Sequence, residues 1–295
     1  MCFSEEVSWG FAALALGAAA VLKLRGRPVV RSALLIYFGL MEVFQALTYR
    51  VIEDECSGSP PNKWNQVLTL VSYIHVSCQP LAVNWFIFGV QKRLTRNNPK
   101  LGHDQVASAV ARLCMAFAVL MFIKALPAVL NLADDVLPWP LRVCGADAEF
   151  LCDPGVQGWG CSAKGHFHLQ WRLRLIEEGY YIPGLSMHFF LFFMPALLLC
   201  EWPLKIFWMI VLVTGPLLLD RMVLNNRAAH LFEEPAIWCQ FSVAQALLAL
   251  VWELVYVPIV TRRKRAVRAA GLLAAKPAGD AQAVIECVGG KHKAQ

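Results

Sequence analysis

The sequence predicts an all-α protein, a bundle of seven transmembrane helices with a disulfide-stapled loop on the outer side of the membrane. Hydrophobic residues make up 58% of the 295-residue chain and charged residues only 16%, whereas soluble domains carry about 25% charged residues. The charged residues are gathered between apolar blocks, and seven blocks reach or approach the ~20 residues that a helix needs to cross a bilayer. Basic and acidic connections also alternate along the chain.

The predicted spans follow one another through mostly short polar connections. They lie at about Trp9–Leu24, Val29–Tyr49, Asn65–Val90, Ser108–Leu130, Ile182–Cys200, Pro203–Met222 and Ala236–Val260. The fifth and sixth are joined by a tight turn, and Pro203 suits the first turn of a new helix. This pair forms two full spans or, alternatively, a re-entrant unit. The membrane domain therefore covers residues 1–261, and the tail 262–295 is basic at first and then of a composition that predicts disorder.

The connections also predict the orientation of the bundle, because cytoplasmic loops are enriched in Lys and Arg. The basic clusters are residues 23–31, 92–100 and 262–268, and the acidic runs are 53–55, 134–135 and 233–234. With seven helices, the three basic clusters fall on one side and the acidic runs on the other. We expect an N-terminus that is outside or luminal and a cytoplasmic C-terminus.

The cysteines fit this orientation. Six of the ten fall outside the membrane or at the outer ends of helices: Cys2, Cys56, Cys144, Cys152, Cys161 and Cys239. An oxidising compartment allows up to three disulfides among them, with 15 possible pairings. A zinc site is an alternative, although the chain has no Cys-x2-Cys pair. We expect residues 131–181 to form a stapled cap, with a short interfacial helix over 171–181, and the membrane to be the plasma membrane or an endomembrane with an oxidising far side.

The third predicted span carries a polar face. Ser72, His75 and Gln79 are spaced i, i+3 and i+7, so they share one side of a helix. Pro80 follows at once and removes a backbone donor, which predicts a kink. A polar stripe beside a kink is costly against lipid, so we expect it to face the protein interior or a wet cavity.

Polar side chains from five predicted helices fall at similar depths in the outer half of the bilayer, as judged from the ~1.5 Å rise per residue. They are Glu42, Gln45, His75, Lys124, His188 and Asp220. An ionisable group inside a membrane costs a few kcal/mol unless it is paired, so we predict that these residues form one site. Its histidines and carboxylates, with His168 from the cap, suit a divalent metal such as zinc or iron.

Most members of this predicted site also have a structural interpretation. A single membrane histidine such as His75 can simply hydrogen-bond two helices. Lys124 can extend its amine to the interface, and Asp220 can pair with Arg221. Glu42 is the hardest to explain in this way, because no basic residue lies within two turns of it on its own helix. No His-x-x-x-His or His-Glu-x-x-His motif occurs, so metal ligands would have to come from separate helices.

Two resemblances bear on the site. Ser72-x-x-His75 in a membrane helix resembles the motif of the superfamily of alkaline ceramidases and progestin/adiponectin-type receptors, seven-helix zinc proteins that are mostly lipid hydrolases. The paired histidines of that superfamily's last helix are missing here. A second resemblance, over residues 1 to about 260, is to a family of uncharacterised polytopic membrane proteins. It is carried by Met1-Cys2-Phe3-Ser4, Leu40-Met41-Glu42, Tyr73-Ile74-His75, Gln79-Pro80, His168-x-x-Trp171 and Pro235-Ala236-Ile237-Trp238-Cys239. This resemblance implies one site made of Cys2, Glu42, His75, Gln79 and His168.

Three functions are compatible with these patterns. The first is a metal-dependent membrane hydrolase or oxidase acting on a lipid or small amphiphile, in which water bound to the metal is the nucleophile. The second is a transporter, channel or receptor that binds a small ligand or ion, and the third is an accessory subunit whose polar residues lock helices together. The roles predicted are catalysis for Glu42, His75, Gln79 and Ser72, metal binding for Glu42, His75, His188, Asp220 and His168, and a ligand pocket for Lys124 and Gln45. The basic residues lie between and after apolar blocks, so we expect lipid and small-ligand partners and no nucleic acid.

Overall fold

The computed structural model describes residues 4–26, 29–56, 61–94, 103–130, 142–143, 156, 160–165, 168–177, 185–200, 202–213 and 234–251, with four two-residue pieces between 254 and 267. Two compact units divide the chain, Met1–Ala249 and Leu250–Gln295. The first is mostly helical and carries two short pairs of strands. In the second, the described residues beyond the end of the last long helix form isolated helical turns.

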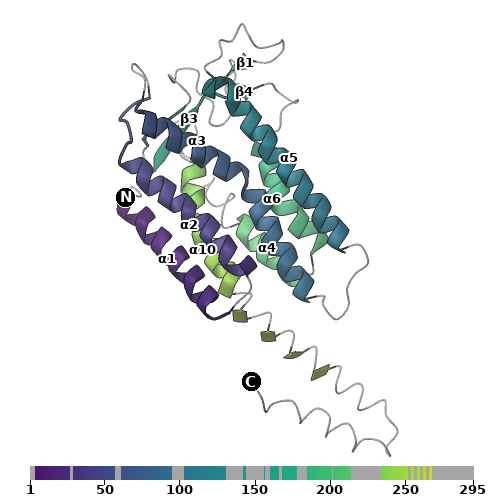
Figure 1. Ribbon diagram of the computed structural model, residues 1–295. Helices are drawn as coiled ribbons and strands as arrows, with labels where there is room; N and C mark the ends of the chain where they lie inside the picture. The colour runs from purple at the N-terminus through teal and green to yellow at the C-terminus, as the bar shows by residue number, and fades with distance from the viewer. Residues whose placement is uncertain are drawn as a thin grey trace, which may run out of the picture. The chain divides into compact units, whose positions relative to one another are not determined.

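Helices α1 (Glu5–Leu24) and α2 (Val29–Tyr49) form an antiparallel pair (Figure 1). The side chain of Ser4 caps α1, and Glu5 and Glu6 in the first turn complement the positive end of its helix dipole. Small residues let the two backbones approach closely. A Cβ on Gly39 of α2 would lie only 3.1 Å from the Cβ of Ala15, so this contact requires glycine.

The third predicted span consists of two helices, α3 (Lys63–Ser77) and α4 (Gln79–Leu94), separated by a break at Cys78. The backbone N–H of Cys78 is shared between the carbonyls of Ile74 and His75, both at 3.1 Å. Pro80 falls in the first turn of α4, where its missing N–H leaves no helical bond unmade. The predicted kink beside Pro80 is therefore confirmed, and its cause is the proline together with the helix end that precedes it.

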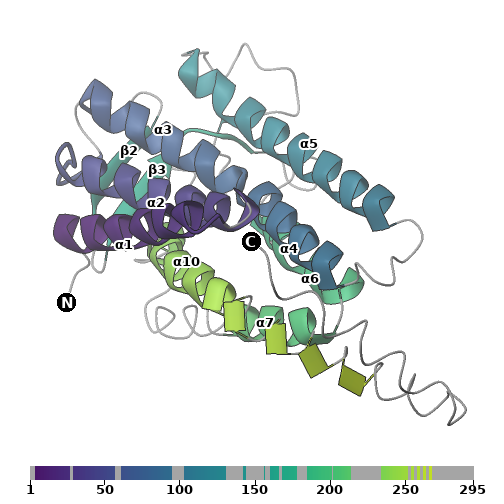
Figure 2. The same cartoon turned by 60° about the horizontal axis from the view of Figure 1, so that its bottom comes forward.

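The remaining helices are α5 (His103–Val129), α6 (Leu185–Leu199), α7 (Trp202–Leu212) and α10 (Glu234–Val251). Within the described residues, four helical stretches are long and apolar enough to cross a membrane: Glu5–Leu24, Val29–Tyr49, Lys63–Lys92 and Asp104–Leu126. They coincide with the first four predicted spans, and the shorter apolar helix Met187–Leu199 falls in the fifth. In Figure 2, α6 lies alongside α4 and leads into α7. Much of the predicted sixth span, residues 214–222, lies outside the described residues.

The predicted cap contains strands where an interfacial helix was expected. Strands β2 (Gly160–Lys164) and β3 (Leu169–Leu173) pair antiparallel, and β1 (Arg142–Val143) pairs with β4 (Ile176–Glu177). The expectation of a helix over 171–181 is wrong for 171–177, because alternate residues of β3 point into the protein core. Residues 178–181 lie outside the described residues.

The β2–β3 hairpin is fastened to the start of α3. A disulfide joins Cys56 to Cys161 of β2, with 5.8 Å between their Cα atoms. Asn65 of α3 donates to the carbonyl of Ser162 and accepts from its N–H, at 2.8 and 2.7 Å. One of the predicted outer disulfides is thus present, whereas Cys239 is corrected to a buried free thiol of α10. Cys2, Cys144 and Cys152 lie outside the described residues.

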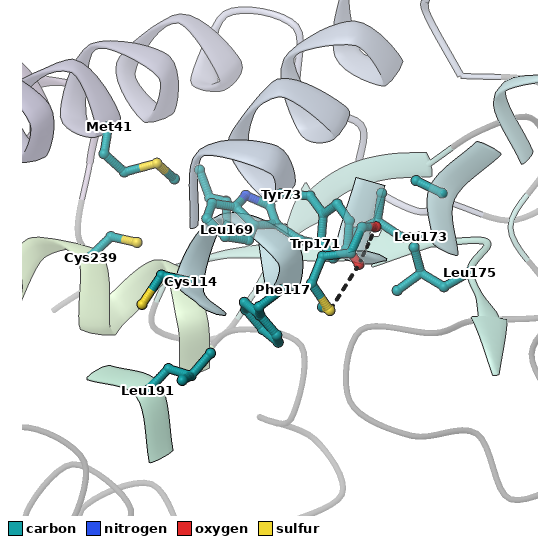
Figure 3. Close-up of a cluster of buried hydrophobic side chains, with 12 residues drawn as sticks. Met41, Tyr73, Cys114, Phe117, Leu169, Trp171, Leu173, Leu175, Leu191 and Cys239 are labelled. Atoms are coloured by element: carbon teal, nitrogen blue, oxygen red, sulfur yellow. Dashed lines mark hydrogen bonds between the residues drawn. The ribbon is translucent and has the colours of Figure 1, made fainter. Parts of the chain in front are cut away.

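The apolar face of the hairpin packs into the helix bundle. Leu169, Trp171 and Leu173 are completely buried, in one cluster with Tyr73 of α3 and Phe117 of α5 (Figure 3). The cluster also holds Met41, Cys114, Met121, Ala125, Leu175, Leu191 and Cys239. Because one core is shared by strands and helices, this part of the cap is integral to the bundle.

Candidate functional site

The candidate site lies where α2 packs against the C-terminal end of α3. The rings of Tyr37 and His75 are stacked, with centroids 3.9 Å apart and planes 18° from parallel. The hydroxyl of Tyr37 donates a hydrogen bond to the backbone carbonyl of His75. Phe44, two turns further along α2, meets the same imidazole edge-on at 5.6 Å. The imidazole is therefore held between two aromatic residues of α2, and its Nε2 atom has no hydrogen-bond partner.

Glu42 is on another face of α2 and is completely buried. Neither of its carboxylate oxygens makes a hydrogen bond of ordinary geometry. The side chain of Ser8 on α1 interacts with this carboxyl group, and Cys239 of α10 lies near it. Three helices thus converge on one buried carboxyl group.

Gln79 links this carboxyl region to the break between α3 and α4. Its Nε2 donates to the thiol of Cys239 at 3.7 Å, while its Oε1 has no partner. In Figure 3, the side chains of Cys239 and Met41 extend toward the same space in the bundle. Tyr37 lies near both Cys78 and Cys239. We call Tyr37, Glu42, His75, Gln79 and Cys239 the polar cluster.

Three further residues of the predicted site lie buried in the same bundle. Ser72 is fully buried on α3, one turn before His75, and its hydroxyl has no partner. Gln45 is fully buried one turn after Glu42. Lys124 of α5 is also buried, with 4% of its surface exposed.

His168 is held in the cap. Its Nδ1 lies 2.8 Å from the hydroxyl of Tyr49 and 2.7 Å from the N–H of Leu169. Because Nδ1 accepts from the Leu169 N–H, the neutral ring carries its proton on Nε2. Burial lowers the pKa of His168 to about 3. This histidine joins the hairpin to the end of α2.

His188 of α6 occupies an aromatic pocket. The rings of Phe117, Phe192 and Trp238 surround it at centroid distances of 5.9 to 6.1 Å. Its Nε2 has no hydrogen-bond partner. Asp220 lies outside the described residues. Of the predicted metal ligands, Glu42 belongs to α2 and His75 to α3, where His75 packs against Tyr37 and Phe44 of α2, while His168 and His188 occupy separate places. No group of three or more His, Cys, Asp or Glu side chains is placed to share a metal ion within the described part of the chain.

An apolar groove lies beside the polar cluster, between α2, α4 and α5. Its volume is about 600 Å³, and its lining residues are Ala33, Leu34, Ile36, Tyr37, Leu40, Cys78, Leu81, Ala82, Asn84, Trp85, Phe88, Ala107 and Ala111. Tyr37 belongs to both the groove wall and the polar cluster. The groove was not predicted from the sequence, because its apolar lining residues do not stand out among the apolar residues of membrane helices. The alanines of α5 at i and i+4, which leave space on one face, are the signal that could have indicated it.

The fold and the site together define the class of protein. It is mostly helical, it has helices long and apolar enough to cross a membrane, and it carries a cluster of buried polar residues. The chain belongs to a family of unknown function (DUF5765), whose model matches residues 6–266. This agrees with the resemblance to an uncharacterised family and lends no support to the ceramidase analogy. No curated protein and no solved structure matches the chain.

Proposed function

We propose that the protein is a seven-helix membrane protein that binds a small ligand through the polar cluster, as a transporter or receptor does. Its N-terminus is outside or luminal and its C-terminus cytoplasmic. The disulfide Cys56–Cys161 supports this orientation. It lies where α2 ends and α3 begins, on the side of the bundle that we assign to the oxidising compartment. The basic and acidic connections described above support the same orientation.

The observation that carries the proposal is a set of buried polar atoms without partners. Oγ of Ser72, Nε2 of His75 and Oε1 of Gln79 have none, and the carboxyl group of Glu42 beside them is completely buried. A buried unsatisfied group costs about 1–3 kcal/mol, so a purely structural polar network would leave few of them. Groups kept unsatisfied inside a membrane are typical of a site that a ligand or ion completes.

Substitution of Gln79 by leucine tests this proposal against a structural role. If the Gln79 amide serves a ligand, Gln79→Leu removes an unsatisfied buried group, and the ligand-free protein gains a few degrees in Tm. The matched control is Asn84→Leu, since Asn84 is a buried amide of α4 that donates to the carbonyls of Pro80 and Leu191 at 2.8 and 2.7 Å. Asn84→Leu should lower Tm. A loss of stability of similar size in both variants contradicts the ligand-site proposal and favours the accessory-subunit function.

The alternative function is a metal-dependent enzyme, and elemental analysis distinguishes it from a ligand-binding protein. We expect purified wild-type protein and His75→Ala to contain no stoichiometric zinc or iron. One metal ion per chain that is lost in His75→Ala would contradict the ligand-binding proposal. Its remaining ligands would then have to include residues outside the described part of the chain, such as Asp220.

A further inference from the structure

We infer that the apolar groove holds the chain of a single-chain amphiphile, which reaches the polar cluster from the bilayer with its polar end at Tyr37. This rests on the proposed function and names its ligand class. The lining of the groove, its opening toward lipid, its length and Tyr37 at its inner end support this ligand class.

The lining of the groove suits a hydrocarbon chain. Ten of its thirteen lining residues are alanine, aliphatic or aromatic hydrocarbon side chains, and the others are Tyr37, Cys78 and Asn84. The amide nitrogen of Asn84 is already committed, because it donates to two backbone carbonyls, while its Oδ1 has no hydrogen-bond partner. Water needs two to four polar partners in a cavity, whereas an alkyl chain gains free energy from every CH₂ group buried.

The groove opens toward lipid. Its walls are parts of three candidate membrane spans, and Ile36, Leu40 and Trp85 on its rim are 40%, 39% and 53% exposed. Residues this apolar and this exposed on membrane-spanning helices face hydrocarbon rather than water. A chain can therefore pass from the bilayer into the groove without crossing a polar surface.

The length of the groove matches one lipid leaflet. Its lining residues run from Cys78, at the break between α3 and α4, to Phe88 of α4, ten residues later, which is about 15 Å at ~1.5 Å per residue. This is half of the ~30 Å hydrocarbon core. The volume of about 600 Å³ also lies within the range of roughly 300–1,000 Å³ that ligand pockets show.

Tyr37 stands between the groove and the polar cluster. Its ring lines the groove and stacks on His75, and its hydroxyl donates to the backbone carbonyl of His75. A diacyl lipid keeps its headgroup at the interface, so only the end of its chain could reach this depth. A single-chain amphiphile can instead bring its polar end to Tyr37, where the hydroxyl oxygen still offers an acceptor.

Cys78 provides a native probe of the groove. Among the free cysteines of the described residues it lines the groove and is partly exposed, while Cys114, Cys200 and Cys239 are buried. In lipid nanodiscs, the rate at which N-dodecylmaleimide modifies Cys78 is measured by peptide mass spectrometry, with and without oleate. We expect oleate to slow the modification about tenfold, and dioleoyl phosphatidylcholine added at the same acyl-chain concentration to leave the rate within twofold.

A groove-filling variant and a matched control complete the test. Ala111→Phe places a ring in the groove wall and should slow the modification about tenfold, whereas Val119→Phe, on an exposed position of the same helix, should not. Equal rates with and without oleate in wild-type protein overturn the inference, even if Ala111→Phe fails to fold. Equal protection by the diacyl lipid also overturns it.

The outcomes separate this inference from the proposed function. If oleate gives no protection and Gln79→Leu is stabilised, the amphiphile inference fails and the polar ligand site stands. If oleate protects Cys78 and Gln79→Leu is destabilised, the groove binds the chain but the proposed role of the polar cluster fails.

Discussion

Asn65 makes the contacts whose loss we expect to detach the β2–β3 hairpin from α3. Its amide nitrogen donates to the carbonyls of Val51 and Ser162 at 2.9 and 2.8 Å, and its amide oxygen accepts from the N–H of Ser162 at 2.7 Å. Two of these three bonds reach the hairpin, and a hydrogen bond contributes about 1 kcal/mol net, so Asn65→Ala should cost about 2 kcal/mol of the stability that holds the hairpin to α3.

The effect should be seen first at β2, because the hairpin opens while the helices remain packed. A change of about 2 kcal/mol corresponds to roughly a thirtyfold increase in an opening equilibrium. Amide hydrogen exchange followed by mass spectrometry measures it directly for peptides that cover β2. The disulfide at Cys161 keeps the opened hairpin tethered, so the experiment is done without reductant.

The control is Gln66→Ala, the next residue on α3. Gln66 is also a buried amide, but its Nε2 donates to the carbonyl of Pro61 in the α2–α3 connection. The Gln66→Ala variant should leave the rate of amide hydrogen exchange in β2 within a fewfold of the wild-type rate. An increase of less than about fivefold for Asn65→Ala, or an equal increase for both variants, would refute the reasoning that the two bonds to Ser162 hold the hairpin.

Three further predictions concern the outer end of the bundle. Cys56→Ser should cost roughly 2–4 kcal/mol of unfolding free energy and abolish the sensitivity of Tm to dithiothreitol, and peptide mapping of unreduced wild type should recover Cys56 linked to Cys161. The hydrogen bond from Lys164 lowers the pKa of the exposed Asp54 carboxyl, so Lys164→Met should raise that pKa toward an ordinary aspartate value in a ¹³C NMR titration, and an unchanged value would show that the pair is not formed. Burial lowers the pKa of His168 from 6.5 to about 3, so the stability linked to its neutral form is complete above pH 6.5 and is lost as the pH falls toward 3, by at most ~1.4 kcal/mol per unit. Denaturation of His168→Asn between pH 7.5 and 4.5 should show a shallower loss than wild type, and parallel curves would contradict this assignment.

Hydrophobic block length predicted the first four spans well, because a helix that crosses a bilayer needs a long apolar run regardless of its neighbours. The strands of the cap were missed for a different reason. The alternation in Leu169-Gln170-Trp171-Arg172-Leu173 has the period of two that a half-buried strand shows. The charged residues that follow suggested an amphipathic helix, and the partner strand β2 carries no such clear pattern.

The site was predictable as a set of residue types and not as an arrangement. Glu42 and Gln79 are unusual in membrane helices, so composition alone indicated them. Depth along a helix does not tell which neighbour a side chain faces, and this is why His188 could not be separated from His75 by sequence. Tyr37 and Cys239 were not assigned to the site, because an aromatic ring and a thiol are ordinary residues in a membrane core.

The polar third span has a consequence for how the chain is inserted into a membrane during synthesis. Lys63–Lys92 is the least hydrophobic of the four candidate spans in the described residues, and its buried face includes Asn65, Thr69, Ser72 and Gln79. Side chains of this kind partition poorly from the translocon into lipid as an isolated helix. This segment should therefore leave the translocon together with neighbours that cover its polar face, so variants that expose that face are expected to lower the yield of inserted protein before they alter the folded molecule.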